Sequence, residues 1–300
     1  MKAYLDCIPC FLRQLLDGAQ MIQANSAQKK KVVDQFLKMV LKSSEKKSPP
    51  EIACLAHRLL KKQAGDSDPY EKIKKKSNQL VLGLYGQLKE MVERSDRPLQ
   101  KALELAIAGN IIDFGAKNNL NINEELGKIL SEDPESAGQR FFSHFNDFKS
   151  ALRNARTILY LADNSGEIVF DRLLTEEIRK KFPEIKIYFA VKEKPVINDA
   201  LVEDALKCGL DKSTEIISNG TDAPGTLLSC CSKKFLKIYK DADVVISKGQ
   251  GNFESLSEEI RPIFFLFMVK CPVVAKETGR KIGDRILFFK SGKGKQDQGF

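Results

Sequence analysis

The stretch TILYLADNSGEIVFDR, residues 157–172, decides the fold class. The apolar run Thr157–Ala162 is typical of a buried strand, the polar segment after it contains a glycine, and the residues that follow have helical spacing. The same unit recurs downstream, where further apolar runs predict strands at Lys186–Val191, Glu215–Ser218, Asp243–Ser247 and either Phe264–Val269 or Val273–Ala275. Strands that alternate with helices predict an α/β domain with a mostly parallel sheet over residues 151–300.

The first half of the chain has a different period. Apolar residues recur at helical spacing from the first residues onward, and Asp6 is the expected cap of the first helix. The segments Ser48–Glu51 and Asp68–Glu71 each combine a capping residue, a proline in the first turn and a glutamate three residues on, so each predicts a helix start. We therefore expect an all-helical domain over residues 1–150.

One further predicted helix belongs to this domain. It runs from Pro98 to Gly115 and places Asn110 and Asp113 on one face, because residues three apart are neighbours on a helix.

Composition limits the class of protein. The chain has 300 residues, of which 42% are hydrophobic and 30% charged, which excludes disordered and fibrous proteins. No apolar stretch reaches the ~20 residues of a membrane-spanning helix, and Asp6 lies where a secretory signal would be apolar. Seven cysteines are few and odd in number. These features predict a cytoplasmic protein without a membrane partner.

The net charge of +9 raises the question of nucleic acid. Short lysine runs such as Lys29–Lys31 and Lys74–Lys76 are scattered along predicted helices, and the aromatic residues that stack on bases do not accompany them. We interpret these runs as solvated helix faces and expect no nucleic-acid partner. The surplus charge is better suited to a small anionic substrate.

Polar turns follow four of the predicted strands, and the carboxyl ends of parallel strands meet at one edge of a sheet. The turns are Asp163–Glu167, the segment from Lys192 to Asp199, Asn219–Asp222 and Lys248–Asn252. Their side chains are therefore expected to converge on one site.

The residue types in these turns indicate phosphoryl chemistry. Asp163, Asn164 and Asp199 offer hard oxygen ligands that suit Mg²⁺ or Mn²⁺, and Co²⁺ or Ni²⁺ also fits. Lys248 and the backbone N–H groups of the next four residues are typical of a phosphate site: Gly249, Gln250, Gly251 and Asn252. A metal would activate water and polarise the phosphoryl oxygen, and Glu167 is the candidate for handling the proton.

Other phosphate-handling motifs are incomplete. Gly249-Gln250-Gly251 lacks the third glycine of a dinucleotide fingerprint, and the chain has no P-loop. The haloacid-dehalogenase type of phosphatase has a second aspartate two residues after the first, where this chain has Ser165. A covalent aspartyl-phosphate is therefore not indicated.

Cys7-Ile8-Pro9-Cys10 is a CxxC motif at an expected helix start. Its thiols are open to three interpretations: structural residues, half of a metal site, or a redox pair. A second CxxC is absent from the sequence, and no strand is predicted before this one, as a thioredoxin-type motif requires.

With these residues assembled, the chain resembles the metal-dependent damage-control phosphatases, formerly the eighty-ninth domain of unknown function, in their N-terminal CxxC subfamily. The resemblance covers nearly the whole chain through YLDCIPCFLRQ (4–14), DPYEKIK (68–74), AIAGNIIDFGA (106–116), LADNSGEIVFDR (161–172), VKEKPVINDALVEDA (191–205) and SKGQGNFESL (247–256).

This resemblance implies a Rossmann-like three-layer α/β/α core behind the helical domain, and hydrolysis of phosphate monoesters with a divalent metal, often Mn²⁺, Co²⁺ or Ni²⁺. It implies the same metal ligands and Lys248 as a phosphate contact. It further implies that Asn110 and Asp113 line the cleft and that Lys192 is its basic residue. Lys194 stands where the family motif tends to have a small residue.

Three functions follow as hypotheses. The first is a metal-dependent phosphatase acting on small phosphorylated metabolites, such as sugar phosphates or damaged phosphometabolites. The second is a non-catalytic protein that binds a phosphorylated ligand and uses the CxxC pair as a redox or metal switch. The third is a protein carboxyl methyltransferase, and the missing third glycine counts against its nucleoside pocket.

Overall fold

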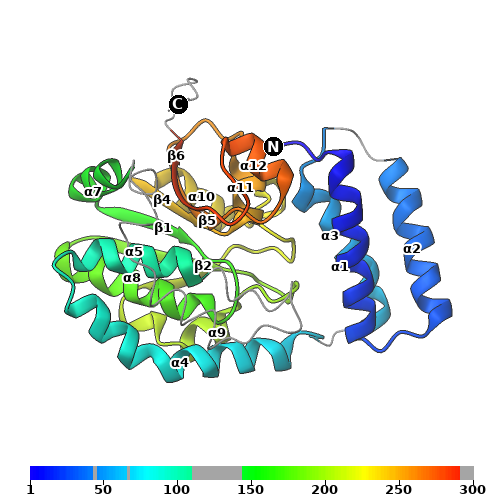
Figure 1. Cartoon of the computed structure of the whole chain (residues 1–300), viewed down its shortest axis with the longest axis horizontal. Helices are drawn as coiled ribbons and strands as arrows, with labels where there is room; N and C mark the ends of the chain where they lie inside the picture. The colour runs from blue at the N-terminus through cyan, green and yellow to red at the C-terminus, as the bar shows by residue number, and fades with distance from the viewer. Residues whose placement is uncertain (43–45, 66–67, 110–143, 291–300) are drawn as a thin grey trace.

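The computed structural model describes residues 1–42, 46–65, 68–109 and 144–290, and it places a helical region before an α/β region (Figure 1). The helices of the first region are α1 (Ile8–Met21), α2 (Ser26–Leu41), α3 (Pro49–Ala64), α4 (Glu71–Glu93) and α5 (Pro98–Ala108), and the 3-10 turn η1 (Leu5–Cys7) precedes them. In the described ranges, no helix is both long and apolar enough to span a membrane.

Helices α1, α2 and α3 form a unit with an apolar core of its own, at one end of the molecule in Figure 1. Its fully buried side chains include Leu15 of α1 and Phe36 of α2, and Phe36 meets the ring of Phe11 edge-on with centroids 6.5 Å apart. The periodicity predicts a face of Ile8, Leu12, Leu15 and Ala19 for the first helix, and the structure buries Leu15 and Ala19 of these together with Phe11 and Gly18, while Ile8 and Leu12 are half-buried.

Helices α4 and α5 belong instead to the core of the sheet. Val81 of α4 and Leu103 of α5 are fully buried in the same apolar cluster as Ile158 of the first strand and Phe170. The apolar core of α1–α3 is therefore distinct from that of the sheet, although Cys54 of α3 packs against Ala223 and Leu227 of the α/β region. The domain boundary expected near residue 150 remains a prediction.

The sheet has six strands in the order β3-β2-β1-β4-β5-β6. The strands are β1 (Thr157–Leu161), β2 (Lys186–Val191), β3 (Glu215–Ser218), β4 (Val244–Lys248), β5 (Ile263–Met268) and β6 (Arg285–Lys290). All neighbouring pairs are parallel except β5 and β6, and Ile158 of β1 lies in register with Ile187 of β2 and Val244 of β4. The prediction of a mostly parallel sheet behind a helical region is confirmed.

Helices cover both faces of this sheet, so the α/β region has three layers. The remaining elements are α7 (Phe145–Asn154), α8 (Glu167–Lys181), α9 (Val202–Lys207), η3 (Leu210–Lys212), η4 (Leu228–Cys230), α10 (Lys233–Asp241), α11 (Gln250–Leu256) and α12 (Pro272–Thr278). Helices α4, α5, α8 and α9 lie on one face and α10, α11 and α12 on the other (Figure 1). Side chains of β1 alternate between the two cores, Tyr160 on the first face and Leu159 on the second.

Of the three predicted helix caps, Ser48 lies at the N-cap of its helix, Asp68 lies three residues before its helix begins, and Asp6 is not a cap. Ser48 precedes α3, and its N–H donates to Glu51 Oε2 at 2.7 Å, as the motif predicts. Asp68 does not cap α4 directly: its Oδ1 accepts from the N–H of Tyr70 at 2.9 Å, and the helix begins at Glu71. Asp6 lies inside η1 and Cys7 precedes α1, so the prediction of an Asp6 cap is wrong.

Two strand expectations are also settled. The fifth strand is the Phe264–Val269 alternative, whereas Val273–Ala275 lies in α12. β6 was not predicted, because a single antiparallel edge strand lacks the strand–turn–helix pattern used to find the others.

Candidate active site

The strand order reverses between β1 and β4, which are neighbours although their chain segments lead to opposite edges of the sheet. Open α/β sheets bind ligands in the crevice outside the carboxyl ends of the strands at such a point. The turn 163–166 after β1 and Gly249 after β4 both lie there. The topology thus locates the candidate site before any side chain is considered.

Asn164 and Asp199 lie opposite each other at this edge. An isolated antiparallel bridge pairs them, which places their Cα atoms about 5 Å apart. The N–H of Ala200 donates to the carbonyl of Asp163 at 2.9 Å, and Asn164 Nδ2 donates to Asp163 Oδ2 at 2.9 Å. The structure therefore brings the three predicted metal ligands together from two separate turns.

The chemistry of these three side chains fits a hard divalent cation. Two carboxylates and one amide supply oxygen, and Asn164 bonds to Asp163 through its nitrogen, so its oxygen is the atom it can offer to a cation. In the neighbouring residue, the Ser165 hydroxyl is buried without a hydrogen-bond partner. Because the set contains only two carboxylates, it is not a group of three His, Cys, Asp or Glu side chains, and no such group occurs in the described part of the chain.

Lys192 places a positive charge beside this set. It follows β2 directly, its ammonium lies 3.4 Å from Asp199 Oδ2, and it donates to the carbonyl of Gly225. The side chain is almost completely buried, which strengthens its interaction with the carboxylate.

Gly249 makes room for the Asp163 carboxylate. A Cβ at this position would lie 2.0 Å from Asp163 Oδ2, and the backbone has φ +80°, a conformation that favours glycine. The glycine-rich turn after β4 therefore has a direct structural role at the site.

Gly249 and Asn252 of this turn also make hydrogen bonds to neighbouring strands and to the residues that follow them. The N–H of Gly249 donates to the carbonyl of Leu266 at 3.0 Å. Asn252 Nδ2 bridges the carbonyls of Ala162 at 3.1 Å and Lys248 at 2.8 Å. These two groups link β4 and α11 to the neighbouring strands.

Gln250 is directed to another part of the molecule. Its Nε2 donates to Glu254 Oε1 at 2.8 Å and contacts Cys271 Sγ at 3.5 Å. Gly251 packs against Gly225, whose backbone nitrogen is 3.7 Å from the position a Cβ would take.

Lys248 lies inside the protein, where its ammonium contacts Glu167 Oε1 at 2.6 Å and Asp171 Oδ1 at 2.5 Å. All three side chains are at most 1% exposed, and the Tyr160 hydroxyl donates to the same Asp171 oxygen at 2.8 Å. Burial raises the pKa of Asp171 to about 6 against the opposing effect of Lys248. Burial lowers the pKa of Lys248, but the two carboxylates outweigh it and hold the ammonium charged. The structure thus joins the predicted catalytic residues Glu167 and Lys248 as a buried ion pair next to the metal-ligand turn.

Asn110 and Asp113, the two candidates from the helical half, lie outside the described residues.

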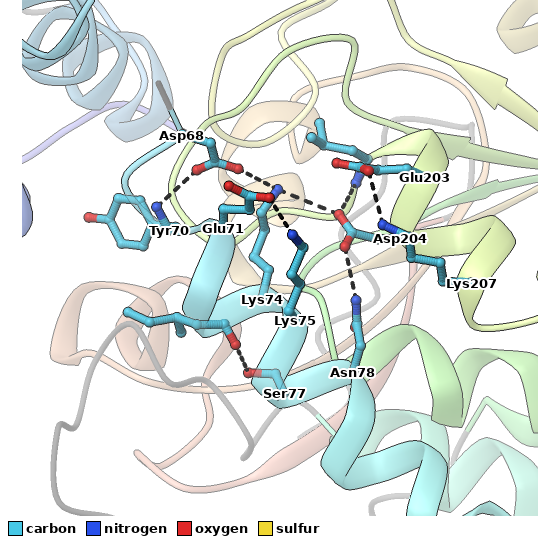
Figure 2. Close-up of polar contacts among 12 residues, drawn as sticks. Asp68, Tyr70, Glu71, Lys74, Lys75, Ser77, Asn78, Glu203, Asp204 and Lys207 are labelled. Carbon is cyan, nitrogen blue, oxygen red and sulfur yellow. Dashed lines mark hydrogen bonds and ion pairs between the residues drawn. The ribbon is translucent and has the colours of Figure 1, made fainter. Parts of the chain in front are cut away.

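A set of buried polar residues on α4 was missed by the sequence reasoning. Lys74 is only 1% exposed, so its interpretation as part of a solvated lysine run is wrong, whereas its neighbour Lys75 is exposed. Lys74 contacts Asp68 at 2.7 Å and Asp204 at 3.5 Å, and Asn78 Nδ2 donates to Asp204 Oδ1 at 2.9 Å (Figure 2). The DPYEKIK motif was the available signal, but it was used only to locate a helix start and a family resemblance.

A cavity of about 320 Å³ separates α1 and α3 from the loop 194–197, which leads into Asp199. Arg58, Lys61 and Lys194 line it, and Asp222 lies 3.9 Å from Arg58 and 3.5 Å from Lys61. His57 lines the same cavity, and burial lowers its pKa to about 4, so the imidazole is neutral at pH 7.

The CxxC cysteines are thiols at the start of α1. Cys7 is half-buried, Cys10 is exposed, and neither is in a disulfide. Surrounding protein atoms partly desolvate both thiols, including that of Cys10, and this raises the pKa of each and favours the less reactive protonated form.

Comparison with known proteins supplies the family. Residues 3–286 match the model of the damage-control phosphatase ARMT1-like domain. A protein of Methanocaldococcus jannaschii described as uncharacterized is 35% identical in an alignment of 295 positions, and the match covers 96% of this chain and 95% of that protein. A damage-control phosphatase of Pyrococcus horikoshii is 34% identical over 92% of this chain and 94% of its own length.

The fold has a solved counterpart. The crystal structure of a DUF89 family protein from Pyrococcus horikoshii superposes with a TM-score of 0.82 at 32% identity, and the match covers 96% of this chain and 99% of that one. These matches bear out the family, whereas the CxxC subfamily stays a prediction.

Proposed function

The chain belongs to the damage-control phosphatase ARMT1-like family, and from this premise we propose that it is a divalent-metal-dependent phosphatase acting on phosphate monoesters of small metabolites. Sugar phosphates and damaged phosphometabolites are the proposed substrate class. The observation that carries the proposal is the bridge between Asn164 and Asp199, which joins two turns with metal-ligand chemistry at the switch point of the sheet.

The proposed ligands are Asp163, Asn164 and Asp199, with Mn²⁺, Co²⁺, Ni²⁺ or Mg²⁺ as the cation. When bound, the cation supplies polarisation of a phosphoryl oxygen and a water of lowered pKa. Gly249 lets the Asp163 carboxylate reach its position, and the bond from Asn164 holds that carboxylate in place.

Lys192 is the residue we propose as the phosphate contact. Its ammonium already lies beside Asp199, and an ammonium carries three hydrogens that can be donated. A positive charge there offsets the negative charge that builds on the phosphoryl oxygens during transfer. A buried cation also favours binding of an anionic substrate over a neutral one.

We propose a supporting role for Glu167 and Lys248. Their buried ion pair fixes the start of α8, which follows the turn carrying Asp163 and Asn164. A fixed turn holds the Asp163 and Asn164 side chains in place beside Asp199, so that they do not have to be reoriented when the cation binds.

The direct test is hydrolysis of p-nitrophenyl phosphate by the purified protein. EDTA is expected to abolish phosphate release, and added Mn²⁺ to restore it. Asp163→Ala and Asp199→Ala are expected to lower the rate at least 100-fold, while Asp241→Ala, on the exposed end of α10, leaves it unchanged. Full activity in EDTA, or in both site variants, would contradict the proposal.

A panel of sugar phosphates and other small phosphomonoesters, each assayed with the four metals, then defines the substrate. Tight binding of a phosphorylated compound without phosphate release under any metal would instead favour the non-catalytic binding protein.

A further inference from the structure

Helix α4 contacts one of the turns that carry the candidate metal ligands directly, and it reaches the other through Asp204 of α9. Asn78 lies on this helix and is 4% exposed, and its Oδ1 accepts from the N–H of Gly166 at 2.6 Å. Gly166 closes the turn that holds Asp163 and Asn164. The contact is close, since a Cβ on Gly166 would lie 3.0 Å from Cβ of Ser77, and φ +82° there favours glycine.

The other end of the Asn78 amide reaches Asp204 in the first turn of α9, the helix that follows the Asp199 turn. Asn78 Nδ2 donates to Asp204 Oδ1 at 2.9 Å, and Asp204 Oδ2 accepts from the N–H of Leu201 at 3.0 Å. Leu201 lies two residues after Asp199. One amide and one carboxylate thus connect the backbones of the two ligand-bearing turns, as Figure 2 shows for the Asn78–Asp204 pair.

The charge of Asp204 is balanced from the same helix. Lys74 lies one turn before Asn78, and its ammonium contacts Asp204 at 3.5 Å and Asp68 at 2.7 Å. Asp68 in turn accepts from the N–H of Tyr70 at 2.9 Å, just before α4 begins. Lys74 and Asp204 are at most 4% exposed, so the pair is shielded from water and its geometry is tightly defined.

We infer that Asn78 and Asp204 form a brace that sets the spacing between the Asp163–Asn164 turn and the Asp199 turn, and that they are positioning residues for the cation. This inference rests on the proposed function. Three of the brace's contacts, to Gly166, Leu201 and Lys74, are made to groups whose position is fixed by secondary structure or burial. Loss of the brace leaves the ligand residues present but frees their turns to move apart, and such outer contacts typically change metal affinity 10- to 100-fold.

The hydrogen-bond pattern allows the residues at positions 78 and 204 to be exchanged, and this swap distinguishes an effect on the position of the metal ligands from an effect on folding. Asn78→Asp sets two carboxylates against each other, because it removes the only donor between positions 78 and 204. In Asn78→Asp with Asp204→Asn, the new carboxylate accepts from Gly166 and from the new amide, whose oxygen accepts from Leu201. The double variant therefore restores the hydrogen bonds from Gly166, from Leu201 and between positions 78 and 204, the last with its donor direction reversed. Lys74 then faces a neutral amide at position 204 and keeps its ion pair with Asp68.

The test is Mn²⁺ binding to the full-length protein by isothermal titration calorimetry, with thermal unfolding in EDTA as the measure of folding. Asn78→Asp is expected to weaken Mn²⁺ binding at least tenfold, and the swap to recover most of that loss. If Asn78→Asp does not fold, Asn78→Ser replaces it, because it removes the amide without adding charge, and it is also expected to weaken Mn²⁺ binding. Lys75→Ala, which removes an exposed ion pair with Glu71 on the same helix, is the matched control and is expected to bind Mn²⁺ like the wild type.

Two results would overturn the inference: wild-type Mn²⁺ affinity in folded Asn78→Asp and Asn78→Ser, or a swap variant that folds like the wild type and binds Mn²⁺ no better than Asn78→Asp. Failure of the proposed function looks different, because the wild-type protein itself would then show no Mn²⁺ binding and no Mn²⁺-dependent phosphate release.

Discussion

Gly249 is the single residue on which the position of the Asp163 carboxylate most depends. In Gly249→Ala, the new Cβ would occupy the space of the Asp163 carboxylate, and the backbone at φ +80° and ψ 155°, a conformation that essentially only glycine adopts, would add strain of about 1–3 kcal/mol. We expect the variant to fold and to lose at least 100-fold in Mn²⁺-dependent hydrolysis of p-nitrophenyl phosphate. The matched control is Gly86→Ala on α4, where the added Cβ meets nothing within 4 Å. Near-wild-type activity of Gly249→Ala would show that Asp163 does not need its present position.

Glu254 gives the molecule a specific pH dependence of stability. Burial raises the pKa of this carboxyl from 4.5 to about 7, because the Gln250 hydrogen bond only partly compensates. Between pH 4.5 and 7 the Glu254 carboxyl therefore keeps its proton in the folded state and loses it in the unfolded state. The contribution of Glu254 to the free energy of unfolding is thus fully present below pH 4.5 and is lost as the pH rises through 7.

Glu254→Gln removes that dependence. At pH 8 the variant is expected to be more stable than the wild type by about 1–3 kcal/mol, and at pH 4 the two are expected to be equal. Urea unfolding at both pH values measures this. A variant that is less stable at pH 8 would mean that the ionised carboxylate is stabilised in the fold.

Strand β4 and helix α8 are joined by one buried cation and two carboxylates. Lys248→Met would leave Glu167 and Asp171 buried without the ammonium that contacts both. Removal of one partner from such a group typically destabilises by about 3–5 kcal/mol. Urea unfolding is expected to show a loss of this size, while Lys240→Met, an exposed lysine of α10, changes stability by less than about 0.5 kcal/mol. A loss below about 1 kcal/mol for Lys248→Met would contradict the described ion-pair geometry.

The elements show which parts of the molecule local sequence patterns could predict. Each parallel strand carries its own apolar run and is followed by a polar turn, so β1 to β5 and the convergence of Asp163 with Asp199 were within reach. The capping signal at Ser48 is local in the same way. β6 was missed because it is an edge strand that pairs antiparallel with β5, outside the repeating unit.

Long-range partners explain what could not be predicted at the site. Lys74 and Lys75 are adjacent and chemically identical, yet one is buried between Asp68 and Asp204 and the other is exposed. Lys248 likewise follows a strand end like a phosphate-binding lysine, but its partners Glu167 and Asp171 lie some eighty positions earlier in the chain. Which lysine is buried, and against which carboxylates, depends on which helix packs over which strand, and the local sequence pattern does not contain that information.

The arrangement of the molecule places the candidate site where three parts of the chain meet. The sheet supplies the two ligand-bearing turns, α4 from the helical region contacts the first turn and reaches the second through Asp204 of α9, and α1–α3 form a core of their own beyond the cavity beside Asp199. The chain as a whole carries a net charge of +9, which favours the approach of a small anionic substrate.

The proposed chemistry requires Asp163, Asn164 and Asp199 to hold one divalent cation. An anomalous difference map from crystals of the full-length protein grown with Mn²⁺, recorded at the manganese absorption edge, locates that cation. We expect one strong peak within about 2.5 Å of an oxygen of each of the three side chains. No peak there in crystals of a protein that shows Mn²⁺-dependent activity, or a peak bound elsewhere such as between Cys7 and Cys10, would contradict this expectation.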